Sequence, residues 1–469
     1  MNAYKVIIIG AGTTGLTARR QVAEKTDSYL VIDDGPLGTT CARVGCMPSK
    51  ALIQIANDVH QTDVIAQSGL LKKGDQQVDS AAVMRHVRSL RNRFVRSVRK
   101  GMEPWEKTHL LRGRAEFIAP DTVQVDGTQY KAEKFILAVG SRPSLLPEWQ
   151  AVKDYIITTD DIFELEELPE SILVMGLGVI GLELGQALSR LGIKVYGVAR
   201  RRALGGICDP EIQDYVCRKM AEEFTIFFDG ARVLGVNAEQ KILFEADGKT
   251  YTADRLLASI GRRHNTDRLQ LEKAGITVND RGLPEYDRQT LRLKEARHIW
   301  FAGDVNEYRP LLHEAADEGY IAGHNAVHQE ACFKRRVPLA ITFSDPNIAR
   351  AGKAFGELEK GCFITGKVSF EGQGRSIVKL KEKGLLKVYA DKDSGELLGA
   401  EMFAPNGEHL AHLLAWAIGM RLTVQQALQM PFYHPVLEEG LRTALRDAAQ
   451  KLGRIAEELE RCNEATTDK

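Results

Sequence analysis

Two stretches of the chain share one arrangement of apolar strands, a glycine-rich turn and an amphipathic helix. The first has apolar residues at Lys5–Ile9, a glycine-rich turn, a helix to about Lys25, and a strand at Tyr29–Ile32 that ends at Asp33. Short apolar runs predict strands, and the helical spacing between them predicts a helix. We therefore expect a strand–turn–helix–strand unit near the N-terminus.

The second unit begins at Ser171. Its strands are predicted at Ile172–Met175 and Lys194–Val198, on either side of a helix at Leu182–Leu191. A unit of this kind holds one pyrophosphate at the N-terminus of its helix. Two units therefore predict two nucleotide-binding domains.

Between and after these units lie three further apolar segments. Phe135–Gly140 and Leu256–Gly261 predict short strands that each end at a glycine and are followed by arginine. We interpret them as equivalent segments through which the chain leaves the two nucleotide domains. Met84–Lys100 has apolar residues at helical spacing and is rich in arginine. We interpret it as an amphipathic helix with a solvated basic face; an anion-binding surface is the alternative.

The pattern changes from Val337 onward. Leu380–Tyr389 and Leu397–Phe403 alternate around a turn and predict antiparallel strands. Helical spacing then predicts an α+β C-terminal domain, whose helices are expected at Gly407–Met420, Thr423–Gln429 and Glu438–Arg461. The polar residues Asn463–Lys469 are expected to fray.

Composition excludes several classes of protein. The 469 residues carry 63 basic and 63 acidic side chains, and this balance argues against a nucleic-acid partner. No apolar run approaches the length needed to cross a membrane, and Val6–Ile9 is too short for a signal peptide. Seven cysteines do not make a disulfide scaffold in a chain this long. We expect a cytoplasmic protein with no metal site.

The first glycine-rich turn, with Gly10, Gly12 and Gly15, has the pattern of a dinucleotide site. Glycine permits the tight turn and the close approach of the backbone to a pyrophosphate. Asp33, at the end of the second strand, is a candidate acceptor for a ribose hydroxyl. A glycine-rich turn without a ligand is the alternative.

The second turn has the same glycines, Gly176, Gly178 and Gly181, but lacks the acid. Arg200 and Arg201 follow its second strand instead. A carboxylate there favours NAD, whereas arginines form charge-assisted bonds with the 2′-phosphate of NADP. NAD or NADP is therefore expected, with a lean towards NADP. The alternative is a solvated basic loop.

Cys41 and Cys46 stand close together, and the other five cysteines are scattered singly. Their spacing is not the Cys-x-x-Cys pattern of structural zinc sites. At this separation they can close a small ring if the backbone is held suitably. Because they directly follow the first unit, they would be delivered towards its nucleotide. Two inert thiols are the alternative.

The whole set of motifs resembles the class I pyridine nucleotide–disulfide oxidoreductases, which include dihydrolipoyl dehydrogenase, glutathione reductase and mercuric reductase. Besides the turns and the cysteine stretch, Gly303 and Asp304 resemble the family's second FAD contact. Segments ending at Gly140 and Gly261 resemble its domain crossings. His434 is similar in its setting to the family's catalytic base.

This resemblance implies an α/β fold with two Rossmann-like nucleotide-binding domains, for FAD and NAD(P), and a C-terminal α+β dimerisation domain. We expect residues 1–145 and 265–335 to bind FAD. Residues 146–264 would bind NAD(P), and residues 336–469 would form the dimer interface.

It also implies a role for each reactive side chain. Cys46 would lie against the flavin, and Cys41 would exchange with the substrate. His434, oriented by Glu439, would act as the base and come from the partner subunit, so a homodimer is expected. Lys50 would lie near flavin N5.

Lys50 is expected to pair with Glu183, and an ordinary structural ion pair is the alternative. The sequence Met47–Lys50 and Val179 resemble dihydrolipoyl dehydrogenase more than glutathione reductase. The resemblance therefore implies a dihydrolipoyl dehydrogenase-like function, in which electrons pass between a dithiol or disulfide substrate and NAD(P) through FAD and the Cys41–Cys46 pair.

Three residues depart from the dehydrogenase pattern: Thr39, Arg43 and Phe432. They leave open a small dithiol or disulfide, a lipoyl domain, or glutathione or a related thiol as the substrate. An FAD-dependent NAD(P)H oxidase or transhydrogenase with vestigial thiols is the second hypothesis, and a flavin-containing sensor is the third.

Overall fold

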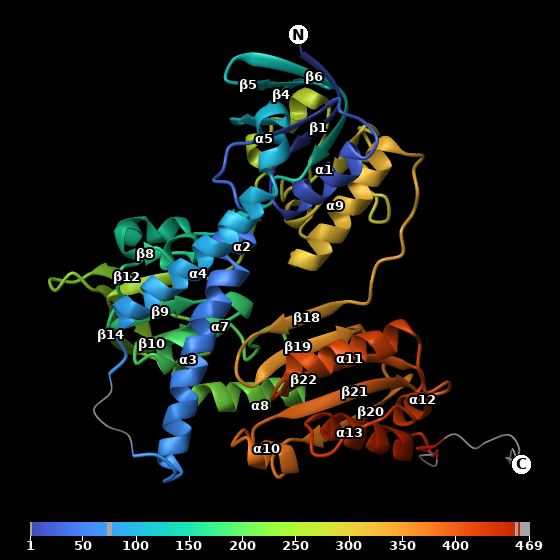
Figure 1. Cartoon of the computed structure of the whole chain (residues 1–469). Helices are drawn as coiled ribbons and strands as arrows, with labels where there is room; N and C mark the ends of the chain where they lie inside the picture. The colour runs from blue at the N-terminus through green and yellow to red at the C-terminus, as the bar shows by residue number, and fades with distance from the viewer. Residues whose placement is uncertain (1, 73–76, 455–457, 460–469) are drawn as a thin grey trace, which may run out of the picture.

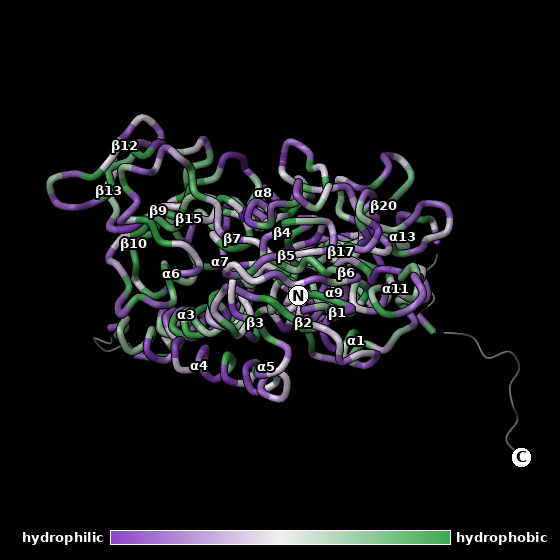
Figure 2. The backbone as a smooth tube through the Cα atoms, turned by 90° about the horizontal axis from the view of Figure 1, so that it is seen from above, coloured by the Kyte–Doolittle hydropathy of each residue, from purple (hydrophilic) through white to green (hydrophobic). Residues whose placement is uncertain are grey.

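The structure is a computed structural model that describes residues 2–72, 77–454 and 458–459. Within these residues two mainly parallel sheets and one antiparallel sheet each carry packed helices (Figure 1). Apolar segments concentrate towards the interior and polar ones towards the outer turns (Figure 2). The predicted fold class is confirmed.

The first sheet has the strand order β3-β2-β1-β6-β5-β4, and β17 pairs with β6. Val6 and Ile8 pack on one face and Ile7 and Ile9 on the other, which is why this strand is apolar at successive positions. Its strands are β1 (Asn2–Ile9), β2 (Tyr29–Asp33), β3 (Leu110–Arg112), β4 (Glu116–Ala119), β5 (Thr122–Val125), β6 (Thr128–Leu137) and β17 (Ile299–Phe301).

Two helices from opposite ends of this region, α1 (Thr13–Ala23) and α9 (Leu312–Val327), pack side by side on the first sheet (Figure 1). The close approach depends on Gly319 and Gly323, because a Cβ at either would lie within 2.6 Å of the α1 backbone.

The second sheet is parallel, with the order β11-β10-β9-β15-β8. An antiparallel sheet of β12, β13 and β14 packs beside it. The elements of this region are β8 (Ile156–Ile157), α6 (Thr159–Ile162), β9 (Ser171–Met175), α7 (Val179–Arg190), β10 (Lys194–Val198), α8 (Pro210–Ala221), β11 (Thr225–Phe227), β12 (Arg232–Val236), β13 (Ile242–Ala246), β14 (Lys249–Ala253) and β15 (Arg255–Ala258).

The chain crosses between the two parallel sheets twice. β7 (Ser141–Pro143) and β16 (Arg262–His264) pair antiparallel at this crossing. Gly140 and Gly261, which precede them, both adopt positive φ, and a Cβ at either would meet no atom within 4 Å. The exact domain boundaries stay a prediction.

Two long helices connect the regions. α3 (Cys46–Gln67) contacts both α7 and α4 (Ser80–Lys100), so the first glycine unit and the second are bridged by the segment that carries the cysteines. The remaining elements here are α2 (Thr40–Val44), α5 (Glu103–His109), η1 (Pro147–Tyr155), η2 (Thr266–Arg268), η3 (Leu271–Ala274) and η4 (Asp304–Asn306).

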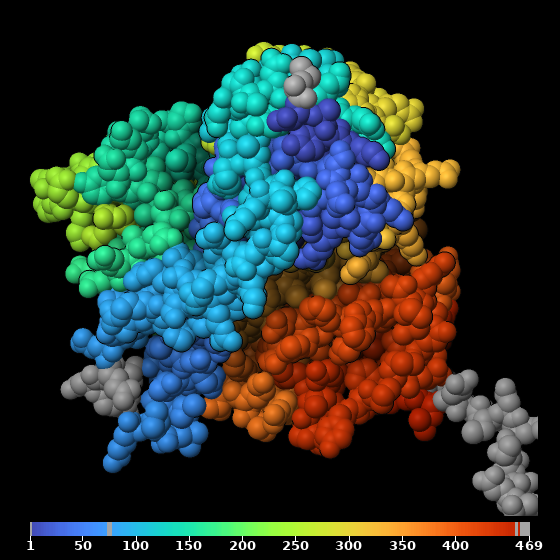
Figure 3. All heavy atoms as spheres, turned by 45° about the horizontal axis from the view of Figure 1, so that its top comes forward, coloured from blue at the N-terminus to red at the C-terminus, as the bar shows by residue number. Residues whose placement is uncertain are grey.

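The third sheet is antiparallel, with the order β18-β19-β22-β21-β20. The space-filling view shows this region as a body at the lower right (Figure 3). Its elements are β18 (Leu339–Thr342), β19 (Asn347–Gly352), η5 (Phe355–Glu357), β20 (Phe363–Ser369), α10 (Gly374–Val378), β21 (Leu385–Asp391), β22 (Leu397–Ala404), α11 (Gly407–Gly419), α12 (Val424–Leu428) and α13 (Glu438–Lys451).

Two element predictions in this region are wrong at one end. The strand expected from Leu380 begins at Leu385, because positive φ angles at Leu380 and Gly384 interrupt an extended conformation. The helix expected to reach Arg461 ends at Lys451, and Gly453 follows with positive φ. The expected frayed end, Asn463–Lys469, lies outside the described residues.

Candidate active site

A tight loop brings the two cysteines together. Cys41 lies in α2, and Cys46 is the first residue of α3, with Gly45 between the helices. A Cβ at Gly45 would lie 3.1 Å from the Cys41 Cα atom. Glycine therefore allows the close approach, and the two thiols are hydrogen-bonded to each other.

The surroundings of the pair favour a thiolate at Cys46. The hydrogen bond from Cys41 is the largest cause that lowers the Cys46 pKa to about 7, and Lys50 lowers it further. The N-terminus of a helix also favours a negative charge. The pKa of Cys41 is raised, because its proton is held in the bond to Cys46 and because the thiol is partly buried.

Lys50 lies one helical turn after Cys46 and forms an ion pair with Glu183 of α7. The Lys50 Nζ to Glu183 Oε2 distance is 2.7 Å, and the Glu183 side chain is buried. The other Glu183 oxygen accepts a 2.8 Å hydrogen bond from the backbone N–H of Phe343. The Lys50 ammonium also lies 4.7 Å from the centre of the Phe343 ring. Three regions of the chain thus meet at one ion pair.

The first glycine turn has space for a ligand at one glycine only. A Cβ at Gly10 or Gly15 would collide with backbone, whereas a Cβ at Gly12 would meet no atom within 4 Å. Gly12 is also the N-cap of α1, and no side chain caps that end. Uncapped N–H groups beside open space fit the pyrophosphate of a dinucleotide.

Asp33 lies at the end of β2, beside the same turn. Its carboxylate accepts hydrogen bonds from the backbone N–H of Ala11, at 2.7 Å, and of Gly35, at 2.9 Å. Burial nevertheless raises its pKa. Asp33 lines a small cavity with Asp34, Gly113, Arg114, Asn265 and Arg268, among others.

Gly303 and Asp304 follow β17 and face the same end of the first sheet. Gly303 has a φ of 87°, and a Cβ there would lie 2.2 Å from the Thr14 hydroxyl oxygen. The Asp304 carboxylate has no hydrogen-bond donor among the described residues. Burial raises its pKa, and nearby Arg262 acts in the opposite direction. Together with Gly12, these features fit a bound FAD.

The second glycine turn repeats the first. A Cβ at Gly181 would lie 1.9 Å from the Gly176 carbonyl oxygen, whereas one at Gly178 would meet nothing. This turn lines a cavity of about 880 Å³, which also contains Arg200 and Arg201. Neither guanidinium has a partner among the described residues, in contrast to Arg202, which pairs with Asp214.

His434 lies between α12 and α13 of the C-terminal region. Its Nδ1 is 3.0 Å from Glu439 Oε2, and Arg442 donates to the other carboxylate oxygen at 3.1 Å. These contacts lower the Glu439 pKa, the bond to His434 first. The His434 side chain is 80% exposed. It lines none of the cavities around the cysteines.

A cavity that the sequence did not suggest opens beside Cys41. It has about 590 Å³ and lies between α1, the cysteine loop, α4 and α5. Phe94 and Trp105 line it, and Arg19 stacks on Trp105. Arg20 also lines it and has no partner in the described part of the chain. The spacing of apolar residues in the sequence predicts an apolar face on α4. Only the packing in the structure shows that this face lines the cavity at Cys41.

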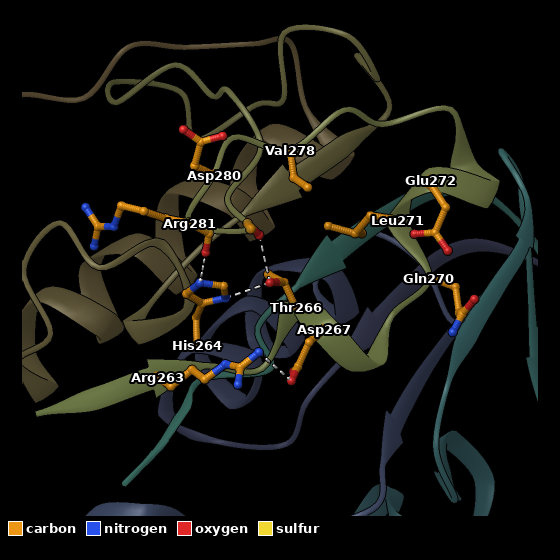
Figure 4. A pocket seen from close by; sticks show the side chains of 11 residues that line it. Arg263, His264, Thr266, Asp267, Gln270, Leu271, Glu272, Val278, Asp280 and Arg281 are labelled. Carbon is orange, nitrogen blue, oxygen red and sulfur yellow. Dashed lines mark hydrogen bonds and ion pairs between the residues drawn. The ribbon is translucent and has the colours of Figure 1, made fainter. Parts of the chain in front are cut away.

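A fourth cavity, of about 300 Å³, is lined by none of the cysteine, Lys50 or His434 side chains (Figure 4). Its central side chain, His264, is bonded through Nε2 to the Arg281 carbonyl and through Nδ1 to Thr266, both at 2.6 Å. The Thr266 hydroxyl also contacts the Gly282 carbonyl oxygen, at 2.9 Å. These polar groups satisfy one another, so the cavity adds no chemistry to the site.

Phe343 is the site residue that sequence reasoning missed, because its contact with Glu183 is made by a backbone N–H. In the described ranges, no group of three or more His, Cys, Asp and Glu side chains is arranged to hold a metal ion. None of the helices described here is long and apolar enough to span a membrane.

Comparison with known proteins agrees with this geometry. The pyridine nucleotide-disulphide oxidoreductase family matches residues 4–319, and the dimerisation domain of the same family matches residues 338–445. The chain is 30% identical to dihydrolipoyl dehydrogenase of Thermus scotoductus, over 95% of this chain and 97% of that protein. The Geobacillus stearothermophilus dihydrolipoyl dehydrogenase is also 30% identical, over 93% and 94%.

Solved structures show the same fold at lower identity. The HOCl-induced flavoprotein disulfide reductase RclA from Escherichia coli has a TM-score of 0.81 at 21% identity, covering 95% of this chain and 99% of that one. LpdA from Mycobacterium tuberculosis has a TM-score of 0.81 at 24% identity, covering 94% and 99%. The chain is therefore an FAD-dependent enzyme and belongs to the pyridine nucleotide-disulphide oxidoreductase family.

Proposed function

We propose that this enzyme transfers electrons between a dithiol or disulfide substrate and NADP(H), through FAD and the Cys41–Cys46 pair. One observation carries the proposal: the Cys41 and Cys46 thiols are hydrogen-bonded to each other, and Cys46 begins a helix on which Lys50 follows one turn later and lowers the Cys46 pKa. FAD, when bound, supplies electron transfer between a nicotinamide and sulfur.

The exchange at sulfur is the part that the chain's own residues perform. A substrate thiolate attacks Cys41 of the oxidised pair, the bond between the cysteines breaks, and Cys46 leaves as a thiolate. The second substrate thiol then displaces Cys41 and closes the substrate disulfide. His434 takes the proton from that thiol, and Glu439 fixes the orientation of the imidazole.

A homodimer is part of the proposal, because His434 is exposed and does not line the cavity that holds Cys41. Large apolar side chains are exposed on the same C-terminal region: Trp416 of α11 is 72% exposed, Met420 directly after α11 is 75% exposed, and Tyr433, next to His434, is 80% exposed. Large side chains exposed in this way mark a surface that another protein covers. A second copy of the chain would bring its His434 to this chain's Cys41.

The nucleotide proposed is NADP. Arg200 and Arg201 line the cavity of the second glycine turn and have no partner among the described residues. Unpaired guanidinium groups favour a 2′-phosphate through charge-assisted bonds. We also infer a cytoplasmic location, since a catalytic thiol pair suits a reducing compartment.

Dihydrolipoyl groups, free or on a lipoyl domain, are the first substrate proposed, because the relatives named above are dihydrolipoyl dehydrogenases. Arg20 supports a second candidate. It is an unpaired cation in the cavity that also holds Cys41, so an anionic disulfide such as oxidised glutathione fits this cavity as well. Lipoate carries a negative carboxylate where lipoamide carries a neutral amide. A preference for lipoate would therefore support an anionic substrate.

Anaerobic titration of the purified yellow protein with NADPH and with NADH tests the proposal. A long-wavelength absorption band should develop after two electrons, at a lower concentration of NADPH than of NADH. Cys46→Ser should lose both the band and turnover. Turnover that survives in Cys46→Ser would instead indicate an NAD(P)H oxidase or transhydrogenase.

Steady-state rates then identify the substrate. Dihydrolipoamide should be oxidised with NADP⁺, and Arg20→Met should lower any preference for lipoate over lipoamide. Arg232→Met is the matched control, because that arginine is exposed on β12 and pairs with Glu245. If the parent protein acts on none of these compounds, the substrate class is wrong.

A further inference from the structure

A buried network of charges joins the segment after α9 to the turn that holds Gly303. Arg335 lies in the linker that runs from α9 to β18 (Figure 1). Its guanidinium binds Glu314 at 2.6 Å and Glu318 at 3.0 Å. Arg309 completes the network with a 3.0 Å contact to Glu314. Both carboxylates are only 2% exposed.

Glu318 connects this network to the backbone of the turn. Its Oε2 accepts hydrogen bonds from the Gly303 N–H and from the Asn306 side-chain amide, each at 2.6 Å. Its Oε1 is the oxygen that binds Arg335. One buried carboxylate thus holds the turn with one oxygen and the linker with the other.

The turn is held from the opposite side as well. The Cα atom of Gly303 packs so closely on α1 that a Cβ would lie 2.2 Å from the Thr14 hydroxyl oxygen. Gly303 therefore has little room to move while Glu318 is in place. Asp304, the next residue, keeps its carboxylate without a protein donor in the described residues. Because Asp304 directly follows Gly303, a fixed backbone at Gly303 also sets the direction of the Asp304 carboxylate.

We propose that Arg335 is a positioning residue for FAD, which acts through Glu318 on the Gly303–Asp304 turn. The inference rests on the flavin site proposed above. Burial raises the pKa of Glu318, whereas the hydrogen bond from the Gly303 N–H favours the charged carboxylate, and so does a nearby cation. Arg335 supplies it from the linker to the dimerisation region. By linkage, bound FAD also stabilises the linker.

A merely structural ion pair makes a different prediction. It would change the free energy of unfolding without a separate effect on FAD affinity. The Nε atom of Arg335 is buried and has no partner among the described residues. The position of this side chain therefore depends on the contacts of its two terminal nitrogens with Glu314 and Glu318.

The test measures the dissociation constant of FAD, by flavin fluorescence, during reconstitution of the apoprotein. Arg335→Met should raise the constant about tenfold, in keeping with the loss of a charge-assisted hydrogen bond. Arg335→Lys should recover much of the affinity. Arg309→Met is the matched control, because it removes a partner of Glu314 and leaves Glu318 untouched. Circular dichroism confirms that each variant is folded at the temperature used.

Equal constants for the Arg335→Met and Arg309→Met proteins would overturn the inference. If Arg335→Met does not fold, the unaltered chain provides the test. Hydrogen exchange in residues 331–336 should then be faster in the apoprotein than in the holoprotein, while exchange in β22 stays the same. Equal exchange in the two forms would also overturn it. A parent protein that binds no FAD would refute the proposed function itself.

Discussion

At the scale of single residues, the chemistry depends on the different environments of two sulfur atoms. The Cys41 thiol donates a hydrogen bond to the Cys46 sulfur, and Cys46 also lies at a helix N-terminus and near Lys50. The hydrogen bond and the helix N-terminus favour the thiolate at Cys46, whereas the charge of Lys50 lowers the pKa of both thiols. The sequence placed both cysteines in one loop, and the fold decides which of them carries the charge.

The first prediction concerns the Cys46 pKa. In the reduced protein, alkylation of Cys46 by iodoacetamide should rise with pH around a midpoint of about 7. Because this pKa is lowered by folding, the thiolate stabilises the native state above that pH, and the contribution is lost as pH falls through it.

Cys41→Ala removes the hydrogen bond that lowers the pKa most, so the midpoint should move upward. Mass spectrometry of the labelled Cys46 peptide across a pH series measures it. Cys208→Ala is the control, since that thiol is exposed elsewhere. An unchanged midpoint in Cys41→Ala would mean that the two sulfurs do not interact.

A second prediction concerns Thr39, where the sequence departs from the expected glycine. Its φ of 64° and ψ of 149° lie in a region that glycine adopts almost alone. Such strain costs of the order of 1–3 kcal/mol. The side chain recovers part of this by accepting a 3.3 Å hydrogen bond from the Ala42 N–H.

Thr39→Gly should therefore raise the free energy of unfolding by about 1 kcal/mol, as measured by urea denaturation. The neighbouring Thr40→Gly is the control. Thr40 begins α2, and glycine there should lower the free energy of unfolding. A destabilised Thr39→Gly protein would show that the cap outweighs the strain.

At the scale of elements, the two glycine turns repeat one design. In each, the first and third glycines are required by close backbone contacts, and the middle glycine faces open space. A side chain at the middle position therefore affects a ligand and leaves the fold intact. Spacing in the sequence identifies all three glycines but does not separate these two roles.

The third prediction uses this difference in the second turn. Gly178→Ala should keep the thermal unfolding temperature and weaken NADPH binding at least tenfold, because its Cβ enters the space that the nucleotide needs. Gly181→Ala should lower the unfolding temperature, because its Cβ would lie 1.9 Å from the Gly176 carbonyl oxygen. Calorimetry and NADPH titration measure the two effects. Unweakened NADPH binding by folded Gly178→Ala would contradict the nucleotide site.

At the scale of the whole molecule, the proposed site needs residues from two copies of the chain. Cys41 lines a cavity between α1, α4 and α5, whereas His434, which is paired with Glu439, is exposed on the C-terminal region. We propose that a second copy covers the exposed side chains of Trp416 on α11 and of Met420 directly after it.

A fourth prediction follows for mixed dimers. Cys41→Ser and His434→Ala should each be inactive as homodimers. Mixing them under conditions of subunit exchange should restore about one quarter of the parent activity, since half the dimers are mixed and each has one intact site. The rate of substrate turnover measures this. No recovery, with exchange verified by mass, would place both residues of one site in the same chain.

Much of the architecture was predictable because it depends on local patterns. The glycine turns, their flanking strands and the antiparallel C-terminal region follow from apolar periodicity and turn residues. The errors lie at Leu380 and after Lys451, where positive φ angles at nearby residues end an element. The pattern of apolar residues cannot predict that a leucine such as Leu380 adopts a positive φ.

The sequence by itself determined the two nucleotide units, the cysteine pair and the His434–Glu439 spacing, because each lies within a short stretch of chain. Only the tertiary structure decided that Glu183 meets Lys50 and Phe343, that Arg20 lines the cavity at Cys41, and that Arg335 reaches Glu318. These contacts join elements far apart in the chain. Their geometry depends on how helices and sheets pack, and local periodicity contains no information about that packing.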